Sequence, residues 1–148
     1  MVYQRKSGTG GKVKAVAVCL TALLLSLASH AEVWGAITNQ RTSTTYNSIQ
    51  AAVDAAQASD TILLDTGFYV ITSAITIDKA LTISGALEAA TFLHYSPFRG
   101  GNVFTINATG ASITLEKMTI RFGDYGIMSS NGNVNVSNCT LQLNGYSG

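Results

Sequence analysis

The side chains best suited to chemistry gather in one irregular stretch in the second half of the chain. His94, Tyr95, Phe98 and Arg99 lie within six residues of one another, around the single proline. Aromatic rings stack on the apolar faces of sugar rings, and a guanidinium group forms paired hydrogen bonds with a carboxylate. These four residues therefore predict a contact site for an acidic glycan. The plainer alternative is a loop whose Tyr95 and Phe98 cover the edge of the core while Arg99 faces water.

A second candidate is a pair of carboxylates, Asp78 and Glu116, each of which follows an alternating strand pattern directly before an expected corner. Hydrolysis of a glycosidic bond by acid–base chemistry needs two carboxyl groups about 5–9.5 Å apart. Residues distant in sequence can reach that separation if successive strands stack at about 4.8 Å. The alternative, two solvated corner residues without a role, is the more common case. No stretch is dense enough in acids to offer the roughly six to eight oxygen ligands of calcium, so we expect no metal or cofactor.

The elements that would hold these residues follow a repeat near the end of the chain. Residues 113–127 return in outline as residues 134–148, and the paired apolar positions are Ile113/Val134, Leu115/Val136, Met118/Cys139, Ile120/Leu141 and Phe122/Leu143. Apolar and polar residues alternate as in a half-buried strand, except for one longer step in each copy. The extra residue, Lys117 or Asn138, marks a corner, and asparagine tolerates a left-handed backbone there. This pattern predicts an all-β fold, a coiled β-solenoid.

Similar alternation predicts further strands upstream. They are expected at residues 61–65, 75–78, 81–84, 91–95 and 102–107, with a corner at 79–80, a loop at 96–101 and a turn at 108–111. Before them, Asn47 and Gln50 stand at capping-box spacing ahead of apolar residues at helical intervals, so we expect a short helix over about Ser48–Ala58. Such a helix would cover the open apolar end of the first coil. We expect about three coils over residues 47–148, with an extended leader at residues 32–46.

Residues 1–31 have the features of an export signal. A basic start precedes the apolar run Ala15–Ala28, and small residues at Ser29 and Ala31 suit a signal peptidase. The run is shorter than the roughly 20 residues of a membrane-spanning helix, so we expect cleavage, with a retained anchor as the alternative. The expected protein is exported, whether secreted, periplasmic or on the cell surface, and has no stable membrane span after cleavage.

Cleavage would leave an acidic chain, because residues 1–31 hold four of the nine Lys and Arg residues and none of the eight acids. An acidic chain has no basic stripe of the kind that nucleic-acid binding needs, so we exclude that class of partner. Cys139 would be the single remaining cysteine, which rules out an internal disulfide. Its place in the repeat predicts a buried core thiol.

Several segments together resemble the start of the right-handed parallel β-helix proteins of the pectin lyase-like superfamily. They are SIQAAVDAAQASDTILLDTGFY, ITIDKALTISGA, ITLEKMTI and VNVSNCTL, and the similarity covers residues 46–148. The resemblance implies a right-handed parallel β-helix. The superfamily includes pectate and pectin lyases, polygalacturonases, pectin methylesterases, copper-site maturation proteins, phage tailspikes and adhesins. Because one fold hosts all of these, the resemblance does not choose an activity.

The motifs of two groups of enzymes in that superfamily are absent from this chain. It has neither the paired aspartates and Gly-His-Gly of polygalacturonases nor the Asp-Phe-Ile-Phe-Gly-like run of pectin methylesterases. We therefore expect a module that interacts with an acidic polysaccharide and is not catalytically complete. The alternatives are a surface adhesin or passenger solenoid with a structural role and, third, a small pectin- or uronate-active enzyme.

A further prediction concerns the C-terminal end of the β-helix domain. The sequence ends within a repeat, which predicts that the β-helix domain continues in a longer parent. If it does not, open strand edges favour self-association through the C-terminal coil.

Overall fold

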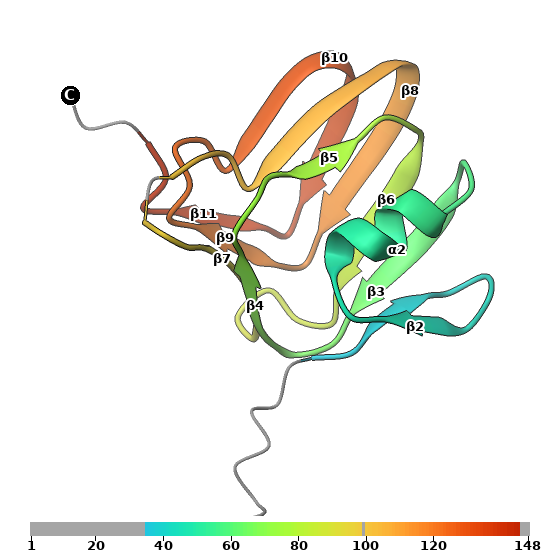
Figure 1. Cartoon of the computed structure of the whole chain (residues 1–148), viewed down its shortest axis with the longest axis horizontal. Helices are drawn as coiled ribbons and strands as arrows, with labels where there is room; N and C mark the ends of the chain where they lie inside the picture. Colours follow the sequence, from blue (N-terminus) through green and yellow to red (C-terminus); the bar gives the residue numbers. More distant parts are fainter. Residues whose placement is uncertain (1–34, 99, 146–148) are drawn as a thin grey trace, which may run out of the picture. The chain divides into compact units, whose positions relative to one another are not determined.

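The computed structural model describes residues 35–98 and 100–145, which form a β-solenoid with one short helix (Figure 1). Its strands are β1 Ile37–Asn39, β2 Thr44–Tyr46, β3 Asp60–Leu64, β4 Gly67–Ile71, β5 Ile75–Ile77, β6 Leu81–Gly85, β7 Thr91–Tyr95, β8 Phe104–Glu116, β9 Thr119–Arg121, β10 Ile127–Ser137 and β11 Thr140–Gln142, and its helix is α2 Ile49–Ala55. The predicted all-β solenoid is confirmed, as are its roughly three coils.

The solenoid has three faces, and each complete coil contributes one strand segment to each face. Face 1 stacks β3, β6 and the second halves of β8 and β10. Face 2 stacks β4, β7, β9 and β11, and face 3 stacks β5 with the first halves of β8 and β10. All these neighbours run parallel, so residues far apart in sequence form columns along the stack.

The repeat near the end of the chain appears directly in the strand register. Ile113 pairs with Val134 on face 1, and Ile120 pairs with Leu141 on face 2. These are the pairs that the sequence alignment predicts. Alternation along each strand then sends one set of side chains into the core and the other set outward.

The predicted corners between face 1 and face 2 are confirmed. Lys117 and Asn138 both have a left-handed backbone, with φ of 58° and 50°. Gly85 makes room for the first of them, because a Cβ on Gly85 would lie 2.0 Å from the carbonyl oxygen of Lys117. A second left-handed corner follows face 2 at Phe122 and Leu143, with φ of 68° and 54°. The sequence does not predict this corner, since neither residue type favours such a backbone.

Inward columns of apolar side chains form the core. On face 1, Ile62, Ile83 and Leu115 stack with no exposed surface. Face 2 adds a column that includes Leu93 and Ile120, also fully buried. The packing of these columns supplies most of the stability, because within the described residues no disulfide joins the coils.

The helix covers the first coil, as expected, but it is shorter than predicted. It runs over Ile49–Ala55 rather than to Ala58, and packs on β5, β1 and β2. Its N-cap is Ser48, whose side chain accepts a hydrogen bond from the backbone of Ala51, so the predicted capping box beginning at Asn47 is wrong. Gln50 instead binds the backbone of Thr76 on β5.

The leader is not simply extended, since residues 37–46 form a hairpin. β1 and β2 pair antiparallel, and β1 also pairs antiparallel with β3, so the hairpin continues face 1 beyond the first coil. A buried carboxylate fixes it: Asp60 accepts hydrogen bonds from Arg41 (2.6 and 3.0 Å) and from Asn39 (2.8 Å).

The predicted turn at residues 108–111 is instead a bend within one long strand. β8 runs through it from face 3 to face 1, with Gly110 at φ 71°, and β10 bends in the same way at Gly132, with φ 103°. Glycine accepts these angles without a steric penalty.

The strands predicted at residues 61–65, 75–78, 81–84 and 91–95 are confirmed to within one residue at either end.

The predicted signal at residues 1–31 and the predicted site residue Arg99 lie outside the described residues. Within residues 35–98 and 100–145, the one helix is too short to cross a membrane.

Candidate functional site

The outward side of face 2 carries a cluster of rings around one guanidinium group, which we call the aromatic patch. It consists of Phe68, Phe92, His94, Phe98, Arg121 and Phe122. Parallel register brings these residues together from β4, β7 and β9 and from the corners that follow β7 and β9. Exposed aromatic surface of this kind marks a binding site more often than scattered apolar residues do.

The rings of the aromatic patch are arranged in two groups. Phe68 and Phe92 are paired across β4 and β7, with ring centroids 4.8 Å apart and planes 12° from parallel. Phe122 meets His94 edge-on at 4.6 Å and Phe98 edge-on at 5.3 Å. The side chains of Phe68 and Phe98 are 53% and 57% exposed, so both groups present ring surface to solvent.

Arg121 lies between the two groups. Its guanidinium carbon is 5.0 Å from the ring centroid of Phe92, 5.4 Å from that of Phe68 and 5.1 Å from that of Phe122. These are cation–π distances. The Nε atom of Arg121 is buried and has no hydrogen-bond partner among the described residues, which is unfavourable for a buried donor.

His94 stands next to Arg121 in the strand register. Partial burial, and then the positive charge of Arg121, lower the pKa of its imidazole below the ordinary 6.5. The ring is therefore mainly neutral near neutral pH, with one nitrogen able to donate and the other to accept a hydrogen bond.

Two of the four residues of the predicted glycan site belong to the aromatic patch, namely His94 and Phe98. Tyr95 does not, because it points inward and is only 5% exposed, with its hydroxyl donating to the carbonyl oxygen of Gly100 at 3.4 Å. The prediction that Tyr95 belongs to the binding site is therefore wrong. Side chains alternate along β7, so Tyr95 faces the side opposite to its neighbour His94. Within the described residues, the guanidinium of this surface comes from Arg121.

The predicted carboxylate pair is not formed. Asp78 lies at the corner between faces 3 and 1, whereas Glu116 lies at the far end of face 1, where its register partner is Ser84. Asp78 is largely exposed and its nearest cation is Lys79, at 3.6 Å. The strand β6, which separates the two corners, keeps the carboxylates apart.

Glu116 is held as an anion. It accepts a hydrogen bond from Ser84 at 2.7 Å and pairs with Lys117 at 3.3 Å, and both contacts lower the pKa of its carboxyl group. A general acid needs the opposite shift, so this setting does not support an acid role for Glu116. No group of three or more His, Cys, Asp and Glu residues that could hold a metal occurs in the parts of the chain that the structure describes.

Cys139 is partly buried rather than fully buried. Its thiol donates toward the carbonyl oxygens of Leu115 and Ser137, and burial is the main cause of a raised pKa. A thiol in this setting is a weak nucleophile.

Sequence reasoning missed Phe68, Phe92, Arg121 and Phe122. A signal for the first two was present, because Phe68 and Phe92 each follow the first residue of a strand that alternates in the same way. Aligning residues 67–71 with residues 91–95 would have paired them. Arg121 and Phe122 gave no comparable signal, since they join the patch only through the stacking of β9 on β7.

The fold and the patch define the chain as an all-β solenoid protein with an aromatic and cationic surface on one face. Comparison of the chain with known protein families, with curated proteins and with solved structures gave no match.

Proposed function

We propose that this protein is an exported, right-handed parallel β-helix module of the pectin lyase-like type that binds an acidic polysaccharide through the aromatic patch. The observation that carries the proposal is the position of the Arg121 guanidinium group over the rings of Phe68 and Phe92, of which Phe68 is largely exposed. A uronate unit has both complements, an apolar ring face and a carboxylate.

The geometry suits a chain of sugars. Phe68 stacks on Phe92 across neighbouring coils and remains 53% exposed, and His94 stands beside Arg121 as a neutral hydrogen-bonding group. The features that support export are the basic start and apolar run of residues 1–31. The β-helix type is supported by the parallel three-faced coils and by the four quoted segments.

The test is a binding titration with an oligogalacturonate, compared with a neutral cello-oligosaccharide of equal length. Arg121→Gln should weaken oligogalacturonate binding by about tenfold or more, because a charge-assisted contact is lost, and should leave any neutral-sugar binding unchanged. Phe92→Ala should weaken binding of both, since it removes stacking surface.

Lys117→Gln is the matched control, because it removes one positive charge outside the aromatic patch. If Arg121→Gln and Lys117→Gln weaken oligogalacturonate binding equally, the effect comes from the net charge of the protein and not from a contact in the aromatic patch. No binding of either sugar to the unmodified chain would reject the proposal in favour of a structural adhesin or passenger solenoid.

A further inference from the structure

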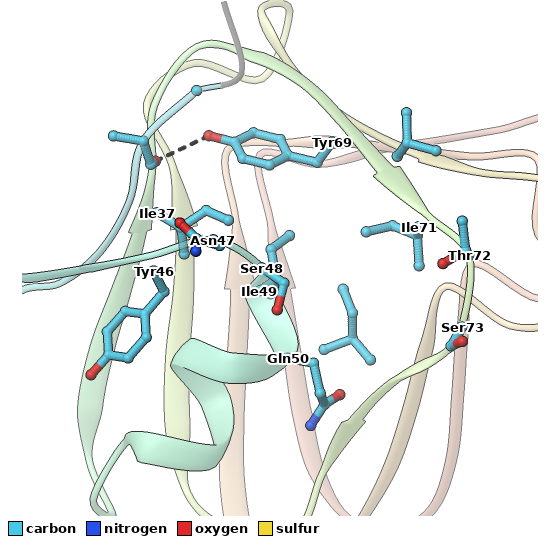
Figure 2. Close-up of a pocket in the computed structure, with 14 residues that line it drawn as sticks. Ile37, Tyr46, Asn47, Ser48, Ile49, Gln50, Tyr69, Ile71, Thr72 and Ser73 are labelled. Atoms are coloured by element: carbon cyan, nitrogen blue, oxygen red, sulfur yellow. Dashed lines mark hydrogen bonds between the residues drawn. The ribbon is translucent and has the colours of Figure 1, made fainter.

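A pocket of about 780 Å³ opens between the start of α2 and the connection from β4 to β5. Figure 2 shows Ser48, Ile49 and Gln50 on one side of it, facing Ile71 and Ser73 on the other. No member of the aromatic patch lines this pocket. Its size falls within the roughly 300–1,000 Å³ of typical small-molecule sites.

The interior of the pocket is apolar. Ile37, Ile49, Ile71 and Ile75 line it, and each keeps between 2% and 7% of its surface exposed. Tyr69 adds a ring whose hydroxyl is already occupied, since it is within hydrogen-bond distance of the carbonyl oxygens of Ala36 and Asp65. The wall of the pocket therefore offers a ligand apolar contact rather than hydrogen bonds.

The rim supplies the polar contacts. The side chains of Asn47, Thr72 and Ser73 line the pocket, and within the described residues they make no hydrogen bond to protein. Ser48 and Gln50 are different, because the N-cap bond and the bonds to Thr76 use their side chains. Three neutral polar groups therefore remain available, from two different segments of the chain.

The charge of the lining restricts the ligand further. None of the lining residues is Asp, Glu, Lys, Arg or His. Burying an isolated charge among apolar side chains without a partner is strongly unfavourable. The pocket therefore selects against ions, in contrast to the aromatic patch with its guanidinium group.

We propose that this pocket binds an uncharged amphipathic small molecule of the fatty-alcohol class. Its alkyl chain packs on Ile49, Ile71 and Ile75, and its hydroxyl group hydrogen-bonds at the rim with Asn47 or Ser73. The site does not depend on glycan binding.

The test uses the full chain and the neutral fluorophore N-phenyl-1-naphthylamine, titrated to saturation and then displaced with 1-decanol or decanoate. We expect binding, with displacement by decanol at a concentration at least about tenfold lower than by decanoate. Ser73→Trp places a ring at the exposed rim and should weaken fluorophore binding by about tenfold or more. Asn47→Trp blocks the opposite rim and should do the same.

Ser112→Trp is the matched control, since Ser112 is also exposed but does not line the pocket. Phe68→Ala separates the two sites, because it alters the aromatic patch alone. Circular dichroism establishes that each variant is folded. Fluorophore binding that is unchanged in both folded rim variants, or lost in Phe68→Ala, would overturn the proposal, as would equal displacement by decanoate.

Discussion

At the scale of single residues, the carboxylate of Asp60 stands out because it joins three segments while its side chain is only 3% exposed. Hydrogen bonds from Arg41 are the largest cause of a pKa well below the ordinary 3.8, followed by those from Asn39 and from the backbone of Gln57. A carboxyl group with a depressed pKa in the folded state stabilises the fold when it is ionised. Asp60 thus connects the β1–β2 hairpin, the helix end and the first coil.

The first prediction concerns Asp60→Asn. Unfolding with urea at about pH 7 should show a clear loss of stability, because Arg41 and Asn39 lose the buried anionic acceptor that ties the hairpin to the first coil. The contribution of Asp60 is complete above its ordinary pKa and is lost as the pH falls toward the folded-state pKa. The difference between the two proteins should therefore shrink between about pH 4 and about pH 2.

Asp54→Asn is the control for this experiment, because Asp54 is exposed and bonds only to Gln50 among the described residues. A constant difference between Asp60→Asn and the unmodified protein across the acid range would contradict the assignment of the effect to ionisation.

At the scale of elements, the corners decide whether consecutive strands can belong to different faces. Lys117 and Asn138 occupy the same left-handed corner one coil apart, yet only asparagine is suited to it. The side chain of Lys117 contributes little in return, since it is about half exposed and its ion pair with Glu116 is only partly shielded from water. The corner in the third coil is therefore held against its local preference by the packing of the strands on either side.

The second prediction follows for Lys117→Asn. It should stabilise the protein by up to about 1 kcal/mol, because asparagine adopts the left-handed backbone more readily. Thermal and urea unfolding measure the change. Lys117→Gln, which also removes the ion pair but has no such preference, should be neutral or slightly destabilising, and equal effects of the two substitutions would reject the backbone explanation.

At the scale of the whole molecule, the two ends of the described solenoid differ. The first coil is covered by α2 and the β1–β2 hairpin, whereas the inward positions of the last coil are open. Leu141 is 52% exposed although its column partner Ile120 is fully buried, and Val136 is 44% exposed beside the buried Leu115. β11 also leaves one of its two backbone edges unpaired among the described strands. Such a surface favours association with another strand edge.

The third prediction is that the 148-residue chain associates with itself as its concentration rises, through the last coil. Leu141→Lys should reduce this association, because it places a charge on the open apolar surface. Sedimentation velocity over a range of concentrations measures it. Leu87→Lys is the control, since Leu87 is 60% exposed on the loop before β7, and an equal effect of the two variants would place the contact elsewhere.

The sequence predicts the solenoid best where the repeat is regular. Residues 113–127 and 134–148 share their spacing because the segments between the strands have equal length in both copies. Lys117 and Asn138 were therefore assigned to corners correctly, and the columns of Ile113 and Ile120 follow from them. Upstream, the strands could be predicted individually from their alternation, but not which of them stack.

The composition of the candidate site depends on that stacking. From one coil to the next, Val70 pairs with His94, His94 with Arg121 and Arg121 with Gln142, at three different sequence separations. The loops and bends between strands vary in length, so no single period predicts these columns. The prediction of a site at His94 and Phe98 relied on closeness in sequence, which also included the buried Tyr95.

The sequence by itself determined the alternation of inward and outward side chains, the positions of the corners at Lys117 and Asn138 and the general β-solenoid class. These follow from the two-residue period of a strand and from the spacing of the repeat. Only the tertiary structure decided that Arg121 lies over Phe68 and Phe92, that Asp78 and Glu116 stay apart, and that Asp60 fixes the hairpin. Those contacts depend on the register between coils, which is set by packing of the whole core rather than by any one segment.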